Sequence, residues 1–221
     1  MKIHQCLQGN IPRGWEAEFA DCDEGILDAC RRLEKDKVDY LPKAEDVFNC
    51  YRLTPKNEVK VVIVGQSAYH TPGLAHGLAF SCLQGVPPSL KTVYQELANT
   101  VDGFVKPAHG NLTAWAQRGV LLMNVSPTAK KGVADYLPRL WMSLIDSTVN
   151  GLVNSNRNIV WMLWGKKAQV LTKLIGDKGF KLLAAHPSPV NTAGGFIGCN
   201  HFNLCNQHLI KLGIQSIDWT L

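Results

Sequence analysis

Four short runs of apolar, β-favouring residues divide the chain, and each run leads into a glycine or a polar residue. They cover residues 61–65, 119–124, 159–164 and 180–186. Segments with helical periodicity accompany them over residues 90–101, 112–117, 140–152, 168–175 and 201–212. Ahead of the first run, residues 14–53 read as helices joined by a turn at 39–43. This alternation predicts an α/β fold with a central four-stranded, largely parallel sheet flanked by helices.

Polar side chains follow the ends of these predicted strands. They lie at residues 65–70, 124–128, 165–167 and 186–190. In open parallel sheets the ligand crevice lies outside the carboxyl ends of the strands, so these four places are expected to converge on one site.

Length and composition indicate one globular domain over residues 1–221, with residues 1–13 as a loose N-terminal extension. The chain is 46% apolar and 19% charged, which is typical of a globular protein with a sizeable core. The start of the chain has no apolar core of a signal peptide, and no stretch reaches the roughly 18 apolar residues of a membrane span. We therefore expect a soluble, intracellular protein.

Seven cysteines are scattered along the chain, an odd number that argues against a fully paired disulfide framework. Cys-x-x-Cys spacing is absent from the sequence, so we expect reduced thiols and no metal. The net charge of +5 is compatible with a polyanionic partner but does not require one.

Taken together, the strand-end residues resemble the main family of uracil-DNA glycosylases. The resemblance begins with Gly65-Gln-Ser-Ala-Tyr-His70, which corresponds to the water-activating loop of that family. It continues in order through residues 76–81, 86–90, 110–124, 163–169, 186–190, 195–202 and 217–219, and more loosely through Trp15 and 40–48. It implies an enzyme that hydrolyses uracil from DNA and leaves an abasic site without a cofactor.

The resemblance also implies a pocket for a flipped-out base. Asn124 would read the uracil edge, Tyr69 would exclude the methyl group of thymine, and Phe80 would stack on the ring. Backbone N–H groups around Gln66 would support uracil O2. Without the resemblance, the two aromatic residues would read as core packing and Asn124 as a turn former.

Two further groups of residues are implied by the same resemblance. His186 would donate a hydrogen bond to uracil O2 as negative charge builds up there, an oxyanion-type stabilisation. Ser89 and Ser188 would grip the flanking phosphates. Val190 stands where the family has a leucine that fills the space left by the flipped nucleotide, so we expect a relative preference for single strands.

Lys166 replaces a serine that is usual in the family. It would either bind phosphate, which would increase the salt dependence of DNA binding, or face water.

Ser67 and Ala68 stand where the family normally has an aspartate followed by a proline. The aspartate positions the attacking water and stabilises the cationic sugar. A serine can hydrogen-bond a water, but it offers no negative charge and is too weak a base to take the proton of the water at neutral pH. Loss of a general base typically costs about 10²–10⁴-fold in rate. Asp102 and Asp135 are carboxylates that the sequence does not place in the site.

Three hypotheses follow from the sequence. The first is a glycosylase that works at a reduced rate, with Ser67 and His186 in the catalytic site. The second is a glycosylase fold that binds DNA or a partner with little catalysis. The third, a different base preference, is disfavoured by Tyr69 and Asn124.

The expected partners are single- or double-stranded uracil-containing DNA, protein inhibitors of these enzymes and replication proteins. We expect a monomer without a membrane partner. The expected location is the cytoplasm of a bacterium or the nucleus of a host cell.

Overall fold

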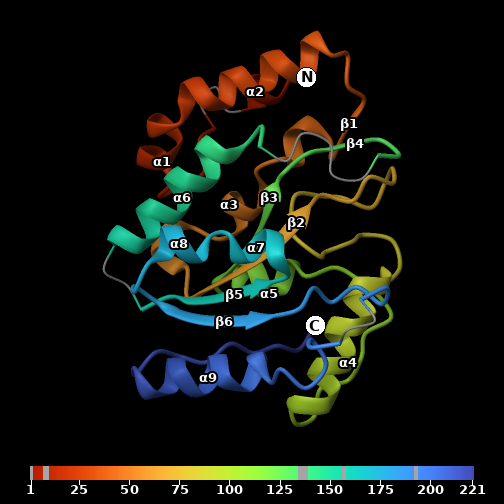
Figure 1. Ribbon diagram of the computed structural model, residues 1–221, viewed down its shortest axis with the longest axis vertical. Coiled ribbons are helices and arrows are strands. Elements are labelled where there is room, and N and C mark those ends of the chain that lie inside the picture. Colours follow the sequence, from red (N-terminus) through yellow and green to blue (C-terminus); the bar gives the residue numbers. More distant parts are fainter. Residues whose placement is uncertain (1, 7–9, 134–138, 156–157, 192–193) are drawn as a thin grey trace.

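A four-stranded parallel sheet forms the centre of the molecule (Figure 1), as the hydrophobic pattern predicts. The computed structural model describes residues 2–6, 10–133, 139–155, 158–191 and 194–221. The strands are β2 (Val61–Ser67), β3 (Val120–Ser126), β5 (Val160–Trp164) and β6 (Phe180–Ala184), in the order β3-β2-β5-β6. Every neighbouring pair is parallel, so all four strands end at the same edge of the sheet.

Strands β2, β3 and β5 are buried on both faces, although β3 lies at one edge of the sheet. Residues 61–65 of β2 and all of β3 and β5 are buried, which explains their continuous apolar sequence. The edge strand β6 is less covered and alternates more in sequence. Burial of the strands on both faces requires helices on both sides of the sheet.

Helices cover the two faces of the sheet (Figure 1). The helices are α1 (Glu16–Asp21), α2 (Asp23–Lys35), α3 (Asn49–Leu53), α4 (Pro88–Thr100), α5 (Thr113–Gln117), α6 (Met142–Asn154), α7 (Lys166–Gln169), α8 (Thr172–Ile175) and α9 (His201–Lys211). On one side of the sheet lie α6, α7 and α8, with α1 and α2 packed outside α6, and on the other side lie α9 and α4. Three short 3-10 helices span Ile3–Cys6, Ala44–Asp46 and Lys56–Glu58.

Two local features differ from the sequence prediction. The single helix predicted over residues 168–175 is wrong, because α7 and α8 are separate short helices. The Thr172 hydroxyl donates to the carbonyl of Gln169 at 2.7 Å, where a continuing helix would place a backbone N–H. The small antiparallel pair of β1 (Tyr40–Leu41) and β4 (Ala129–Lys130) was not predicted from the sequence.

Within the described ranges no helix is long and apolar enough to cross a membrane. All seven cysteines are free thiols. Ile3 and Cys6, inside the predicted N-terminal extension, are buried in the core.

Candidate functional site

A pocket of about 170 Å³ opens at the carboxyl edge of the sheet. It is smaller than the roughly 300–1,000 Å³ of sites for drug-sized ligands, so it suits a single small ring. The pocket combines the end of β2, one residue of β3, the start of α4 and the segment after β6. Its lining residues are Gly65, Gln66, Ser67, Ala68, Tyr69, His70, Phe80, Ser89, Asn124 and His186.

Asn124 is buried beside Gly65 at the meeting of β2 and β3, where the two residues are paired in register. A Cβ atom on Gly65 would lie 2.3 Å from Oδ1 of Asn124 and 2.9 Å from Cβ of Ala79. Only glycine leaves room for the carboxamide here. The carboxamide makes no hydrogen bond to the residues that the structure describes, so its donor and acceptor are available to a ligand.

Phe80 and Tyr69 form a joined aromatic wall of the pocket. The Tyr69 hydroxyl donates to the carbonyl oxygen of Phe80 at 2.9 Å. Phe80 itself has a φ of 62°, a left-handed conformation that is unusual for a bulky residue. Hydrogen bonds made by the two neighbouring residues hold Phe80 in this conformation. The N–H of Ala79 donates to the Leu122 carbonyl at 2.9 Å, and the Ser81 hydroxyl is hydrogen-bonded to Nε2 of His76 at 2.6 Å. The wall is therefore rigid.

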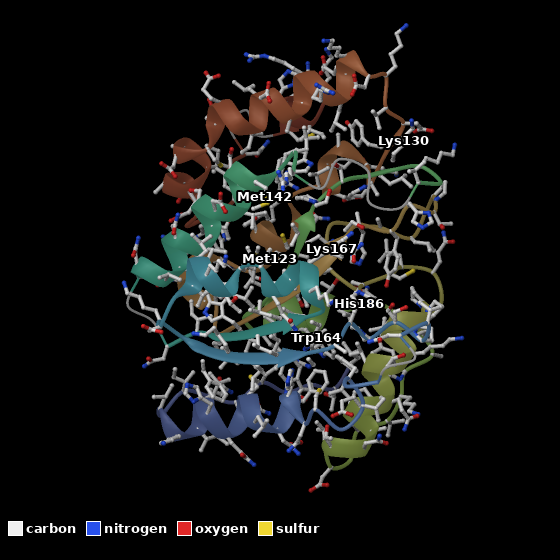
Figure 2. The ribbon with its side chains drawn as sticks, viewed as in Figure 1. Met123, Lys130, Met142, Trp164, Lys167 and His186 are labelled. Carbon is white, nitrogen blue, oxygen red and sulfur yellow. The ribbon has the colours of Figure 1, made fainter. Side chains whose placement is uncertain are left out.

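His186 packs against this wall from the segment after β6. Its ring centroid lies 5.9 Å from that of Phe80, which in turn lies 5.4 Å from that of Trp164. Figure 2 shows His186 and Trp164 at the same edge of the sheet. A Cβ atom on Gly165 would approach that of His186 to 2.8 Å, and the φ of Gly165 is +88°, so glycine is needed here for two reasons.

Trp164 is held from behind by the start of α9. Its indole N–H donates to Nδ1 of His201 at 3.0 Å, deep in the core. Burial lowers the pKa of His201 to about 4, so its Nδ1 remains an acceptor at neutral pH. This bond fixes the indole on which Phe80 packs.

Ser67 lines the pocket at the end of β2 and is half-buried. Its hydroxyl has no hydrogen-bond partner among the described residues, so it can bind a water molecule. The described lining residues include no aspartate or glutamate. Asp102 is exposed beyond the end of α4, away from the lining, and Asp135 lies outside the described residues.

Ala68 changes how this loop is held. Its backbone N–H donates to the carbonyl of Ser126 at 3.1 Å and continues the contact between β2 and β3. A proline has no N–H and could not make this bond. The bond therefore ties the loop to the end of β3.

The structure brings together seven of the ten residues predicted for the site. The seven in the lining are Gln66, Ser67, Tyr69, Phe80, Ser89, Asn124 and His186. Lys166 is exposed at the first position of α7, Ser188 is half-buried, and Val190 is 83% exposed. These three lie outside the lining, on chain segments adjoining Gly165 and His186.

Other residues of the site were missed in the sequence. Gly65 and Gly165 make room for Asn124 and His186, which is a spatial relation that sequence spacing does not reveal. His70 also lines the pocket, and its place in the same loop as Ser67 was a signal that could have identified it. Groups of three or more metal-ligating side chains are not found among the described residues.

Comparisons with known proteins match one family over most of the chain. A family model described as the uracil DNA glycosylase superfamily matches residues 52–210. A uracil-DNA glycosylase of Neisseria meningitidis serogroup A is 45% identical over 200 residues, covering 89% of this chain and 91% of the relative. One from Vibrio vulnificus is 47% identical over 189 residues, covering 84% of this chain and 83% of the relative.

Solved structures share the fold. The crystal structure of mimivirus uracil-DNA glycosylase has a TM-score of 0.87 at 22% identity and covers 100% of this chain and 90% of its own. A mimivirus UNG variant in complex with UGI has a TM-score of 0.88, also at 22% identity, with 100% of this chain and 92% of that chain covered.

Proposed function

The chain belongs to the uracil DNA glycosylase superfamily and is a uracil-excising DNA-repair glycosylase, and we propose that the strand-end pocket is its active site. The observation that carries this proposal is the convergence of Tyr69, Phe80, Asn124 and His186 on one small pocket. The roles of these residues follow from the chemistry that each side chain offers there.

Base recognition rests on the rigid part of the pocket. The Asn124 carboxamide accepts from uracil N3–H and donates to O4, a pattern that cytosine reverses. Its contact with Gly65 confines the carboxamide. The uracil ring stacks on Phe80, and Tyr69 stands where the methyl group of thymine would lie. The hydrogen bond between Tyr69 and Phe80 keeps this steric barrier in place.

Cleavage of the bond between uracil and deoxyribose puts negative charge on the departing base and positive charge on the sugar, and each charge needs a stabilising group. His186 donates to uracil O2 as the base departs with negative charge, and N–H groups around Gln66 support the same oxygen. Ser67 holds the attacking water through its hydroxyl. No carboxylate at residue 67 balances the positive charge on the sugar, so catalysis is slower than it would be with an aspartate.

DNA is held by residues around the pocket mouth. Ser89 and Ser188 donate to the phosphates that flank the flipped nucleotide, and Val190 enters the space that the nucleotide leaves. Lys166 either adds a charged phosphate contact or faces solvent. The substrate is single- or double-stranded uracil-containing DNA, in a bacterial cytoplasm or a host nucleus, and the protein acts as a monomer without a cofactor.

Inhibitor proteins and replication proteins are the proposed protein partners. A mimivirus relative of the same fold is known in complex with UGI, which supports an inhibitor-binding face.

The test is uracil release from a single-stranded oligonucleotide with one central deoxyuridine. We compare the natural protein with Ser67→Asp and His186→Ala at equal concentration. We expect measurable release by the natural protein, a loss of about 10²–10³-fold in His186→Ala, and a gain of at least about tenfold in Ser67→Asp.

A second function is favoured by one observation, the serine at residue 67. If Ser67→Asp released uracil and the natural protein did not, the natural protein would be a silenced glycosylase that acts as a DNA- or partner-binding module. Absence of release from all three proteins would refute the proposed active site.

A further inference from the structure

A second cavity, of about 720 Å³, lies between α2 and the start of α6. Figure 1 shows α2 as an outer layer of the molecule, packed beyond α6. One wall is formed by residues of α2 between Gly25 and Lys35, and the other by residues 139–143. We call this cavity the α2 groove. It shares no described lining residue with the strand-end pocket, so it needs an explanation of its own.

The two walls of the α2 groove are held at a fixed spacing. A Cβ atom on Gly25 of α2 would lie 2.5 Å from Cβ of Ser143 in α6, so the absence of a side chain lets the two helices approach closely. A buried stripe along α2 also fastens that helix to the core, and its members are Ile26, Ala29, Cys30 and Leu33. The groove is therefore formed before any ligand binds.

Positive charge is concentrated in the α2 groove. Arg31, Arg32 and Lys35 line it from α2, where they are three or four residues from Asp28 or from one another and so share one side of the helix. Arg139 lines the other wall. The described lining thus holds four cationic side chains and one carboxylate, and the cations come from two elements far apart in sequence.

Three of these cations are available to a ligand. The exception is Arg32, whose Nε donates to Asp36 at 3.0 Å. The side chains of Arg31, Lys35 and Arg139 are exposed and make no hydrogen bond or ion pair with a described residue. Cations in the last turn of α2 stabilise that helix end, which accounts for Arg32 and Lys35. Arg139 precedes the start of α6, where positive charge is unfavourable, so helix stabilisation does not account for it.

The chemistry of the lining indicates a phosphate backbone as the ligand. Interfaces between proteins have an apolar core depleted in charge, whereas interfaces with DNA are polar and strongly positive. Leu140, which is half-buried, is the one large apolar residue of the described lining. Aromatic residues, on which bases could stack, are absent from that lining. Guanidinium groups bind phosphate oxygens through paired hydrogen bonds and read no base sequence.

We propose that the α2 groove is a second DNA-binding surface, which holds the phosphate backbone independently of base sequence and of uracil. The ligand is DNA because the chain is a DNA-repair glycosylase, but the proposal does not depend on the strand-end pocket being the active site. Electrostatic contacts of this kind let a protein slide and hop along DNA. The groove keeps the enzyme on DNA between excision events.

The experiment measures binding of a fluorescent oligothymidylate of about 30 nucleotides, which contains no uracil, by anisotropy between about 50 and 200 mM salt. Arg31→Gln combined with Arg139→Gln removes one cation from each wall. We expect this groove variant to raise Kd about tenfold at the lowest salt. The slope of log Kd against log salt should fall by about 1.4, because each lost phosphate contact on a single strand removes about 0.7. Asp28→Asn, which removes the carboxylate, should lower Kd about twofold.

A charge-matched control separates the groove from the overall charge of the protein. Lys173→Gln combined with Lys178→Gln removes two cations at exposed positions in and after α8, outside the described lining of the α2 groove. We expect Kd within about twofold of the natural value and an unchanged salt slope.

A second readout uses the natural protein and so does not depend on the folding of a variant. Phenylglyoxal modifies arginine side chains, and mass spectrometry gives the rate at each position. Oligothymidylate should slow modification of Arg31 and Arg139 at least about threefold. Arg13, which is exposed outside the described lining of the α2 groove, should react at an unchanged rate.

Several results would overturn the proposal. These are equal losses of DNA binding in the groove variant and the lysine control, weaker binding by Asp28→Asn, or unchanged reactivity of Arg31 and Arg139 in the presence of DNA. Groove-dependent binding of polyglutamate or of oligouridylate, without groove-dependent binding of DNA, would assign the surface to an acidic protein or to RNA instead. Because the DNA used contains no uracil, failure here is distinguishable from failure of the proposed active site, which the uracil-release assay tests separately.

Discussion

Val190 is the residue whose replacement tests how this enzyme engages duplex DNA. Its side chain is 83% exposed in the segment after β6, and it is one methylene shorter than the leucine usual in the family. A methylene buried in the duplex is worth about 0.8 kcal/mol, or roughly fourfold in an equilibrium. We expect Val190→Leu to raise kcat/KM on duplex DNA about threefold to fourfold relative to single-stranded DNA.

The measurement is the ratio of kcat/KM on matched duplex and single-stranded oligonucleotides. Val170→Leu makes the same change at another exposed valine, which is 58% exposed on the segment between α7 and α8, and should leave the ratio unchanged. The reasoning fails if the natural protein already prefers duplex DNA as strongly as the leucine variant does.

Among the elements, α4 joins the pocket to the start of α9. The helix begins beside Ser89, and its Glu96 side chain is fully buried near the other end. The two carboxylate oxygens accept from the N–H of Gly198 at 2.6 Å and of Asn200 at 2.8 Å. Glu96→Gln replaces one acceptor by an amide donor that faces a backbone donor.

We expect Glu96→Gln to lower the free energy of unfolding by about 2–3 kcal/mol. Urea unfolding at pH 7.5 measures this loss. Glu58→Gln, which removes an exposed carboxylate, should change the unfolding free energy by less than about 0.5 kcal/mol. A loss from Glu96→Gln as small as that of the control would show that the two bonds contribute little.

The helices and strands also show which features of the fold sequence patterns can predict. The four strands were predicted because continuous apolar runs reflect burial on two faces, and the rule for parallel sheets predicted a pocket at their shared carboxyl edge, where the structure has one. The break between α7 and α8 was missed because a threonine side chain replaces a backbone bond. The pair of β1 and β4 was missed because its two halves are far apart in sequence.

The site also has residues that the sequence pattern locates and contacts that only the structure reveals. Asn124 and His186 stand at strand ends that periodicity can locate, but their chemical roles came from the resemblance to a family. The closeness of Gly65 to Asn124 and of Gly165 to His186 depends on tertiary packing. No single-chain pattern encodes such distances, so these contacts required the structure.

The whole molecule carries a built-in sensitivity to acid, because two histidines are buried as neutral groups. His76 and His201 are only 6% and 4% exposed, and burial lowers the pKa of each, to about 4 for His201. In the unfolded chain a histidine has its usual pKa of about 6.5. Between these values the unfolded state binds more protons than the folded state, so stability falls as the pH falls.

His201→Asn tests this linkage and keeps an oxygen that can accept from Trp164. For His201 alone the loss between pH 7.5 and 5 amounts to about 2 kcal/mol, a sizeable share of a typical 5–15 kcal/mol. The variant should be less stable at pH 7.5, yet lose about 2 kcal/mol less than the natural protein on acidification. Urea unfolding at both pH values measures the difference, and titration of carboxylates cancels between the proteins. His109→Gln, at an exposed position, should lose as much stability on acidification as the natural protein. If all three proteins lost the same free energy of unfolding between the two pH values, His201 would remain accessible to protons in the folded state.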